Sequence, residues 1–262
     1  MNEAIVLRGV KVAWVTGASS GIGRAVALEL ARSGVAVAAT ARRQEALAEL
    51  VAEATAAGGF VTAFAGDITD PEAMRKIADE IAATLGPLDL AVLNAGLFIP
   101  VGAAPFDIEA YKKTFDVNLN GTVGCLAAIL PAMTARRAGR IVIVGSVAGY
   151  GGLPSSAAYG ATKAALINMA ESLKFDLDAA GVKIQIANPG FVDTPATRKN
   201  AFRMPALMPV GEAARRIVRG ASSDAFEITF PKRFTYVLKA LRLLPYPAYF
   251  WLVSKATGRS GR

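Results

Sequence analysis

The chain has 262 residues and a mass of 27.2 kDa, which suits one ordinary α/β domain. Hydrophobic residues make up 53% of it and charged residues 19%, so it can bury a sizeable core and is not disordered by composition. The absence of histidine excludes Ser-His-Asp and Cys-His triads and every His-ligated metal site. The single cysteine, Cys125, excludes an internal disulfide and a cysteine zinc site, so we expect no metal centre.

The net charge of +8 comes from the last quarter of the chain. Residues 1–197 hold 16 basic and 18 acidic side chains, whereas residues 198–262 hold 13 and 3. At the N-terminus only four apolar residues precede Arg8, which is too few for a signal peptide. No stretch approaches the roughly eighteen apolar residues of a membrane-spanning helix. Nothing indicates an oxidising compartment, so a cytoplasmic location is expected.

Short β-branched segments alternate with longer segments rich in Ala, Leu and Glu, a pattern typical of βαβ units and a parallel sheet. Strands are predicted at residues 10–16, 35–40, 60–66, 88–94, 140–145, 182–187 and 226–230, and helices at 21–33, 44–57, 71–85, 108–136, 155–179 and 211–219. The strands are almost entirely apolar, as expected where helices cover both faces of a sheet. We therefore predict a single doubly wound α/β domain with a parallel seven-stranded sheet over residues 1–230. Residues 231–262 would be an extension of the same domain.

The first predicted strand runs into a glycine-rich turn at the start of a helix. A strand, a glycine turn and a helix N-terminus together place backbone N–H groups and a positive helix end against a diphosphate. The spacing differs from the commoner G-x-G-x-x-G, but the position after an apolar strand favours dinucleotide binding over a plain turn. The predicted cofactor contacts in this turn are Gly17, Ser19, Ser20, Gly21, Ile22 and Gly23.

The second predicted strand ends at Arg42 and Arg43, near the point where NAD-binding folds place an acid for the ribose hydroxyls. No acid lies between Val35 and Gln44. Two arginines can hold a 2′-phosphate, and in the first turn of a helix they oppose the helix dipole unless an anion balances them. A solvated helix start is the alternative. The sequence favours NADP(H) as the cofactor.

Several polar residues outside this turn are candidates for catalysis. Tyr159 and Lys163 are four residues apart on a predicted helix, so the ammonium is expected to lower the pKa of the phenol and make it a general acid/base. Ser146 follows the fifth strand, where its hydroxyl can polarise a substrate carbonyl. Asn94-Ala95-Gly96 ends the fourth strand, and Asn118 lies inside a long predicted helix, an unfavourable place for asparagine. Each of these alone is compatible with a cap, a turn or a surface pair.

Taken together, these residues resemble the short-chain dehydrogenase/reductase superfamily. The set comprises Thr16-Gly17-x3-Gly21-x-Gly23, Asn94-Ala95-Gly96, Asn118, Ser146, Tyr159-x3-Lys163 and Pro189-Gly190. Their order and spacing match from Val10 to about Thr194, and the thirteen-residue step from Ser146 to Tyr159 is the usual one for that family. The resemblance implies a Rossmann-type fold and interconversion of a carbonyl and a secondary alcohol with a nicotinamide cofactor.

The resemblance also implies roles for individual residues. Tyr159 would donate the proton to the substrate oxygen, and Ser146 would hydrogen-bond that oxygen. Lys163 would bind the nicotinamide ribose and lower the tyrosine pKa, and Asn118 would hold a water in a proton relay. The other implied cofactor contacts are Asp67 and Ile68 at the adenine, Asn94, Ala95 and Gly96 at the adenosine ribose, and Pro189, Gly190, Val192 and Thr194 at the nicotinamide. Ser20 departs from relatives that carry a basic residue inside the glycine turn, so the preference for NADP(H) rests on Arg42 and Arg43.

The resemblance fades after Thr194. Residues 195–210 lie where the family places a mobile lid over the substrate, and their larger apolar side chains are Phe202, Met204, Leu207 and Met208. Residues 97–101 would add an apolar wall. We therefore expect a hydrophobic carbonyl compound, such as a lipid-, steroid- or long-chain-like molecule. Loops that merely cover the core are the alternative for each of these segments.

Residues 232–253 combine cations, an apolar helical face and aromatic side chains, a pattern typical of a segment that lies on a membrane surface. The face comprises Phe234, Val237, Leu238, Leu241 and Leu244, and Tyr246, Tyr249, Phe250 and Trp251 follow it. A helix packed on the domain or on a partner subunit is the alternative, and the sequence leaves the two open. The segment offers no polar base-reading side chains, so no nucleic-acid partner is expected.

The sequence thus predicts an NADP(H)-dependent oxidoreductase. Its rival is a non-catalytic dinucleotide-binding scaffold or sensor recruited to membranes by the tail, against which Asn118, Ser146, Tyr159 and Lys163 argue together. Small residues on the helices at 108–136 and 155–179 would permit close packing between subunits, as in the dimers and tetramers of the family, so a homodimer or homotetramer is expected. These small residues are Gly121, Gly124, Ala127, Ala157, Ala161 and Ala165.

Overall fold

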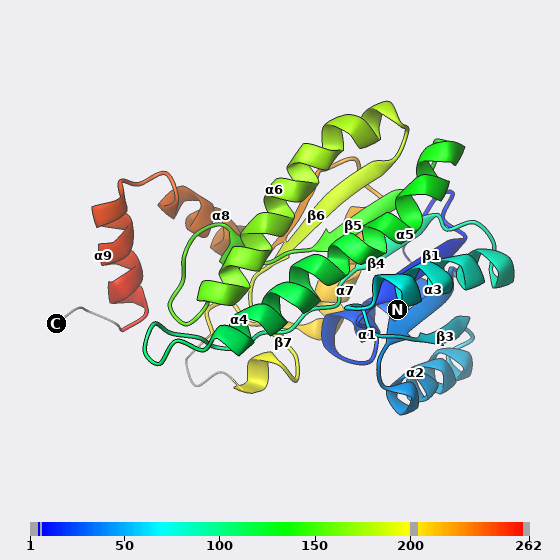
Figure 1. Ribbon diagram of the computed structural model, residues 1–262, viewed down its shortest axis with the longest axis horizontal. Helices are drawn as coiled ribbons and strands as arrows, with labels where there is room; N and C mark the ends of the chain where they lie inside the picture. Colours follow the sequence, from blue (N-terminus) through cyan, green and yellow to red (C-terminus); the bar gives the residue numbers. More distant parts are fainter. Residues whose placement is uncertain (1–4, 6, 200–203, 259–262) are drawn as a thin grey trace.

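Seven apolar segments pair into one parallel sheet, drawn as arrows in Figure 1. The computed structural model describes residue 5 and residues 7–199 and 204–258. The strands of this sheet are β1 Val12–Thr16, β2 Ala36–Ala41, β3 Val61–Ala65, β4 Leu90–Leu93, β5 Arg140–Val144, β6 Lys183–Pro189 and β9 Glu227–Phe230. Their order is β3-β2-β1-β4-β5-β6-β9, and every neighbouring pair is parallel. The predicted sheet is confirmed, and each strand lies within two residues of its predicted bounds.

Helices cover both faces of this sheet. One face carries α1 Gly21–Arg32, α2 Gln44–Ala56 and α7 Val210–Ala221, and the other carries α3 Pro71–Thr84, α5 Gly121–Arg136 and α6 Ala157–Ala179. Successive residues of a strand point to opposite faces, so Val15 of β1 joins one buried cluster while Trp14 joins the other. Both faces are therefore apolar, which explains why the strands are nearly continuous apolar runs.

The helix predicted at 108–136 consists of three parts. α4 Ile108–Phe115 is followed by a π-helical turn, Asp116–Asn120, and then by α5. An 18-residue window of this helix has a mean hydropathy of 1.3, enough by length and composition alone to cross a membrane. Alanine and scattered larger residues raise this average without forming an unbroken apolar run. Cys125, Ile129 and Met133 are buried beside the sheet, as in a core helix.

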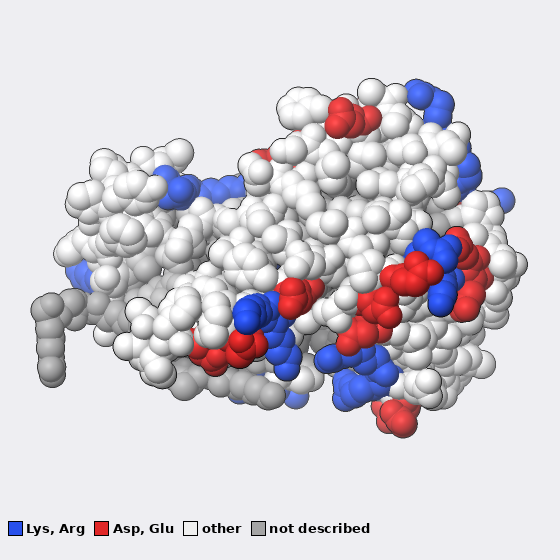
Figure 2. Space-filling view, viewed as in Figure 1, with Lys and Arg blue, Asp and Glu red and all other residues white. Residues whose placement is uncertain are grey.

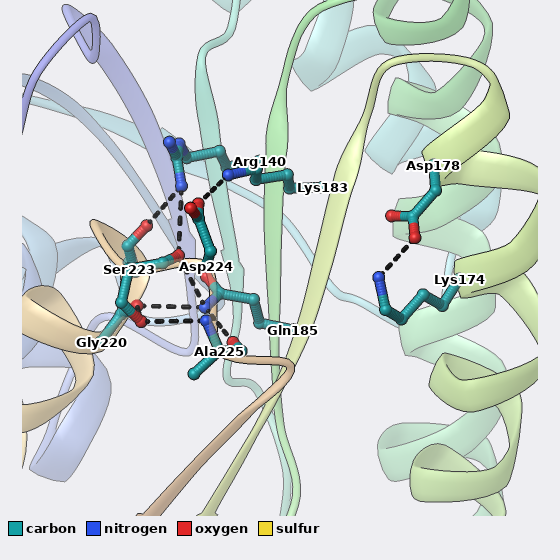
Figure 3. Close-up of polar contacts among 10 residues, drawn as sticks. Arg140, Lys174, Asp178, Lys183, Gln185, Gly220, Ser223, Asp224 and Ala225 are labelled. Atoms are coloured by element: carbon teal, nitrogen blue, oxygen red, sulfur yellow. Dashed lines mark hydrogen bonds and ion pairs between the residues drawn. The ribbon is translucent and has the colours of Figure 1, made fainter.

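Polar side chains fasten the loop between α7 and β9 to the amino-terminal edge of the sheet, as Figure 3 shows. Arg140 and Gln185 donate hydrogen bonds to backbone carbonyl oxygens of residues 220–225. Lys183 forms an ion pair with Asp224 in the same loop. These contacts hold the start of β9 beside β6, at the edge of the sheet where both strands begin.

The C-terminal segment forms two helices, α8 Lys232–Leu241 and α9 Tyr246–Ala256, which extend from one end of the molecule (Figure 1). Phe234 of α8 packs on Phe191, with ring centroids 5.9 Å apart. In α9 the buried Tyr249 donates a hydrogen bond from its hydroxyl to the Gly152 carbonyl oxygen at 2.7 Å. The segment is therefore packed on the domain, as one of the two predicted alternatives has it. We call α8, α9 and the turn between them the tail lobe.

Candidate active site

The candidate site lies at the carboxyl ends of β1 and β4, where the order of the strands reverses. In open α/β sheets this reversal is where ligands bind. Thr16, at the end of β1, accepts hydrogen bonds through Oγ1 from the backbone N–H groups of Asn94 and Ala95, at 3.0 and 3.1 Å. The Asn94 side chain in turn donates from Nδ2 to the Thr16 carbonyl oxygen at 3.1 Å. The two strand ends are thereby held together beneath the glycine turn.

The turn after β1 leaves no room for a side chain at Gly17 or Gly23. Gly17 has a φ of +66°, and a Cβ there would lie 2.8 Å from the Ala95 Cα. A Cβ on Gly23 would overlap the Gly17 carbonyl oxygen, because α1 starts directly against the turn. A Cβ on Gly21 would lie 3.4 Å from Cγ2 of Thr194, which approaches from the far side. This bare backbone fits the diphosphate of a dinucleotide, which needs close approach to N–H groups.

The start of α1 is also open to an anion. Ser20 is the N-cap residue, and its side chain makes no capping hydrogen bond. The first turn of α1 contains no acidic residue. Ser19 precedes it in the turn, and Ile22 packs against the core from the first turn. The first N–H groups of α1 and its positive end are therefore available to a phosphate group.

Arg42 and Arg43 follow β2 and lie beside the glycine turn. Arg43 donates from Nη2 to Ser19 Oγ at 3.4 Å, and Nη1 of Arg42 lies 3.8 Å from Oδ2 of Asp67. Burial raises the pKa of Asp67, but hydrogen bonds from Thr69 and the charge of Arg42 outweigh it, so the pKa is lowered. Two cations and one carboxylate thus gather where the adenosine ribose of a dinucleotide would lie.

Ser146, Tyr159 and Lys163 come together at the carboxyl end of β5. Ser146 begins a 3₁₀ turn, Val147–Gly149, and its Oγ accepts from the Ala148 N–H at 3.1 Å. The same hydroxyl interacts with the phenol of Tyr159 and lowers its pKa. Lys163 is 4% exposed, and its Nζ donates to the Val144 carbonyl oxygen at 2.7 Å. The same Nζ lies 5.6 Å from the centroid of the Tyr159 ring. The arrangement offers a proton donor, a second hydroxyl and a buried cation within one small volume.

The pKa shifts in this cluster differ from the sequence-based expectation. Burial raises the pKa of the Tyr159 phenol, and the hydrogen bond with Ser146 opposes this rise without cancelling it. Burial also lowers the pKa of Lys163, to about 8. The expected lowering of the tyrosine pKa by Lys163 is wrong for this structure, because burial of the phenol is the largest effect and raises the pKa. Ser146 supplies the lowering contribution instead.

Asn118 lies in the π-helical turn between α4 and α5. Its Oδ1 accepts from the Leu97 N–H at 2.8 Å, and its Nδ2 donates to the Leu97 carbonyl oxygen at 3.0 Å and to Thr162 Oγ1 at 3.2 Å. Asparagine suits this helical position because it pairs with both backbone groups of Leu97, in the loop after β4. A Cβ on Gly96 would lie 3.3 Å from Asn118 Oδ1 and 3.7 Å from Lys163 Nζ. Gly96 therefore lies between Asn118 and the buried ammonium.

Two of the small residues predicted to serve subunit contacts face inward instead. A Cβ on Gly121 would lie 2.8 Å from Cγ1 of Ile68, and one on Gly124 would lie 3.5 Å from Pro71. Their role is to let α5 approach the segment that leads into α3, so the prediction is wrong for this pair. The same contact holds Ile68, which directly follows Asp67, against α5.

The segment after β6 brings the predicted nicotinamide contacts to the same edge of the sheet. Pro189 ends β6, and a Cβ on Gly190 would lie 3.1 Å from the Phe234 ring of α8. Val192 begins the two-residue strand β7, Val192–Asp193, which pairs with β8, Met208–Pro209. Thr194 follows, beside the 3₁₀ turn Thr197–Lys199.

The structure describes the expected substrate wall at 97–101 and part of the expected lid at 195–210. The Phe98 ring meets the Tyr159 ring edge-on, with centroids 5.2 Å apart, so an apolar side chain does border the phenol. In the predicted lid, Met208 is buried and Leu207 is exposed. Phe202 lies outside the described residues.

Two polar residues that the sequence analysis passed over contact this site. Asn188 on β6 is fully buried, and its Oδ1 accepts from the Ser146 N–H at 3.1 Å. Glu227 on β9 accepts from Nδ2 of Asn188 at 2.8 Å. A signal was present, because Asn188 directly follows the strand predicted at 182–187 and Glu227 lies within the one predicted at 226–230. The sequence alone does not show that β6 lies between β5 and β9.

Comparisons with known proteins agree with this geometry. The family model described as short chain dehydrogenase matches residues 11–204. An uncharacterized oxidoreductase of Myxococcus xanthus is 39% identical over 91% of this chain and 94% of its own length. A cyclohexanol dehydrogenase of Acinetobacter sp. is 32% identical over 84% and 90%. The 1-deoxy-11-beta-hydroxypentalenate dehydrogenase of Streptomyces exfoliatus is 37% identical over 71% and 68%.

A solved structure is similar in fold. It is a short chain dehydrogenase/reductase from Burkholderia phymatum in complex with NAD, with a TM-score of 0.82. The sequence identity is 24%, and the likeness covers 89% of this chain and 93% of that chain. The doubly wound α/β fold predicted from the sequence is therefore confirmed.

Gly23→Ala should disrupt the glycine turn. The added methyl group would overlap the Gly17 carbonyl oxygen, and backbone cannot rotate away as a side chain can. We expect the free energy of unfolding to fall by about 1–3 kcal/mol. The affinity for a nicotinamide dinucleotide, measured by calorimetry, should fall at least tenfold. The control is Gly102→Ala, where a Cβ meets nothing within 4 Å. Unchanged dinucleotide affinity in Gly23→Ala would remove the turn from the cofactor site.

Proposed function

The chain belongs to the short-chain dehydrogenase family and is an oxidoreductase, and we propose that it interconverts a carbonyl compound and a secondary alcohol with NADP(H). The observation that carries the proposal is the cluster of Ser146, Tyr159 and Lys163 beside the glycine turn. A non-catalytic scaffold needs the turn but has no use for a phenol, a hydroxyl and a buried ammonium at one point. The cluster therefore favours the enzyme over the scaffold.

The residues of the cluster would divide the chemistry as follows. NADPH, when bound, supplies the hydride for the carbonyl carbon. Tyr159 donates its phenolic proton to the carbonyl oxygen, which completes the alcohol and leaves a phenolate. Ser146 donates a hydrogen bond to the oxygen on which negative charge develops. Lys163 provides positive charge beside the phenolate, and Asn118 anchors the backbone after β4 on the other side of Gly96.

A hydrophobic substrate fits the surroundings of the phenol. Phe98 lies edge-on to Tyr159, and the partly buried Ile99 follows it. Burying an apolar substrate against such side chains contributes to binding, whereas a small polar carbonyl compound would gain little from them. The test is a reductase screen with NADPH against ketosteroids, long-chain 3-keto lipids and small aldehydes. Faster turnover of the small aldehydes would contradict a preference for hydrophobic substrates.

Tyr159→Phe should remove catalysis but not cofactor binding. The change deletes only the hydroxyl, so turnover should fall by roughly 10²-fold or more while NADPH affinity persists. Tyr236→Phe, on the exposed face of α8, is the matched control and should keep parental turnover. Steady-state kinetics and calorimetry measure the two quantities. Substantial turnover in Tyr159→Phe would show that another group donates the proton.

We propose NADP(H) rather than NAD(H) because of the charges at the adenosine end. Arg42 and Arg43 lie beside Ser19 and Asp67, within reach of a phosphate on the ribose. Asp67 offsets part of this charge, but two guanidinium groups remain against one carboxylate. An extra phosphate on the ribose would therefore find a site with net positive charge.

Replacing Arg42 and Arg43 together by alanine should raise the KM for NADPH far more than that for NADH. Each charge-assisted hydrogen bond to the 2′-phosphate should be worth about 1.5–3 kcal/mol. Arg75→Ala serves as the control, because its exposed side chain pairs with Glu72 and Asp79. Steady-state kinetics with both cofactors make the comparison. Equal effects on the two cofactors would contradict the assignment.

We propose a homodimer or homotetramer with contacts on the face of α5 and α6. Val123 and Ala127 of α5 are exposed there, and Phe175 of α6 is 81% exposed. Ala157 and Ala161 are exposed at the start of α6. The surface over these helices is largely free of charged side chains in Figure 2. Burying it between copies would remove large apolar side chains from water.

We also propose that the protein works in the cytoplasm and that its tail lobe contacts an anionic membrane surface. Leu243 is 87% exposed, and Phe250 and Trp251 are exposed on α9. No acidic residue follows Glu227, and Figure 2 shows blue side chains among white ones on this lobe. Two lobes packed on one another would bring their cations together, which favours a lipid surface over a second copy.

The tail lobe should therefore bind anionic vesicles at low salt and neutral vesicles much less. Each cation near the surface should contribute about 1 kcal/mol, weakened by salt. Leu243→Gln with Trp251→Gln should abolish co-sedimentation without changing NADPH affinity, because both side chains are exposed. Leu238 and Leu241 are half-buried and would be poor choices. No binding by the parent protein, or a changed oligomeric state in the variant, would decide for a subunit contact.

A further inference from the structure

Asn188 and Glu227 connect the candidate catalytic serine to the far edge of the sheet. The Ser146 N–H donates to Asn188 Oδ1 at 3.1 Å, and Asn188 Nδ2 donates to Glu227 Oε1 at 2.8 Å. A Cβ on Gly145 would overlap Asn188 Oδ1, so the amide lies directly against the backbone that leads into the serine. Three neighbouring strands are thus joined by one chain of hydrogen bonds, which runs from the carboxyl ends of β5 and β6 to the first residue of β9.

Glu227 also contacts the last residue of the loop 146–150, which begins at Ser146. Tyr150, which follows the 3₁₀ turn Val147–Gly149, donates from its hydroxyl to Glu227 Oε1 at 2.5 Å. The same hydroxyl lies 3.0 Å from Thr229 Oγ1. Residues 146–150 are therefore fastened at their first residue through Asn188 and at their last residue by Glu227 directly.

The second oxygen of Glu227 reaches the tail lobe. Lys239 of α8 forms an ion pair with Glu227 Oε2, and its Nζ lies 5.2 Å from the centroid of the Tyr150 ring. Burial raises the pKa of Glu227, but hydrogen bonds from Lys239, Tyr150 and Asn188 outweigh it, so the pKa is lowered. The side chain is a carboxylate at neutral pH, and each of these three partners donates to it.

We propose that Asn188 and Glu227 are positioning residues that set the orientation of the Ser146 hydroxyl, and that Lys239 ties this setting to helix α8. The inference rests on the proposed function, in which Ser146 contacts the substrate oxygen. Asn188 acts on the backbone of Ser146, and Glu227 acts on Asn188 and on the end of the loop. None of the three contacts the reacting atoms.

This arrangement has a measurable effect on Tyr159. Ser146 is the group that lowers the pKa of the phenol against the effect of burial, and the titratable group that faces the ring among the described residues is Lys163. If the serine hydroxyl loses its orientation, the phenol keeps the effect of burial and loses the opposing contribution. Its pKa then rises, and alcohol oxidation, which needs the phenolate, moves to higher pH.

Glu227→Gln tests the proposal with a side chain of the same size. An amide has one acceptor oxygen and one NH₂ donor, so it cannot accept from Lys239 on one side and from Asn188 and Tyr150 on the other. We expect the apparent pKa of alcohol oxidation to rise by about half a unit to one unit, and kcat to fall about fivefold to tenfold. The KM for NADPH should stay within about twofold, since the glycine turn is untouched.

Adding Lys239→Gln to Glu227→Gln should restore the parental pH profile. A neutral pair can form, in which the NH₂ group of residue 227 donates to the new amide at residue 239 while its oxygen again faces Asn188 and Tyr150. Lys239→Gln alone should shift the profile less than Glu227→Gln, because the carboxylate still accepts from Asn188 and Tyr150.

Asp224→Asn is the matched control. It removes the ion pair with Lys183, which also joins β6 to the segment of β9, but at the opposite edge of the sheet (Figure 3). A purely structural role for Glu227 predicts that both variants lose thermal stability and that neither moves the pH profile. An unshifted profile in Glu227→Gln, or an equal shift in Asp224→Asn, overturns the proposal.

A second measurement separates this inference from the proposed function. The pKa of Tyr159 can be read without a substrate, from the ultraviolet absorbance titration of each protein minus that of the same protein carrying Tyr159→Phe. We expect the value to rise in Glu227→Gln by the same half unit to one unit. A parent with no oxidoreductase activity would sink the proposed function, whereas an unchanged tyrosine titration would sink the positioning role.

Discussion

Every strand of the main sheet runs in the same direction, and the position of the candidate chemistry depends on this constraint. In a parallel sheet all carboxyl ends lie along one edge, so residues far apart in sequence become neighbours there. Thr16 meets Asn94 across β1 and β4, and Ser146 meets Asn188 across β5 and β6. The opposite edge carries Arg140 and Gln185, whose contacts serve only to hold the loop before β9. The candidate site residues and the residues that hold this loop thus lie toward opposite ends of the strands.

Much of this edge could be predicted because its signals are local. The glycines between β1 and α1 mark a turn wherever the rest of the chain lies, and apolar runs mark the buried strands. The spacing of Tyr159 and Lys163 places them on one helical face without knowledge of the fold. The cluster formed by these two residues and Ser146 therefore appears in the structure much as the sequence predicts.

The rest depends on contacts that no local pattern encodes. Gly121 looks like a residue for subunit packing until α5 is placed against Ile68. The direction of the Lys163 ammonium depends on where β5 ends, and the pKa of Tyr159 is raised rather than lowered because the phenol is buried. Asn188 and Glu227 lie on strands whose adjacency follows only from the order of the sheet. The apolar helical face predicted for residues 232–244 is interrupted because α8 ends at Leu241, so Leu244 lies outside the helix.

The π-helical turn at Asp116–Asn120 constrains how this chain can change length. Such a turn holds one residue more than the α-helical turn it replaces. Deleting a residue there would give a regular helix with α4 and α5 still in phase, but it would change the positions of the side chains inside the turn. The Asn118 amide would then swing away from Leu97, and the backbone after β4 would lose both partners. Descendants of this sequence should therefore accept insertions and deletions in the surface loops but not in these five residues, although a shorter helix would be the more stable one in isolation.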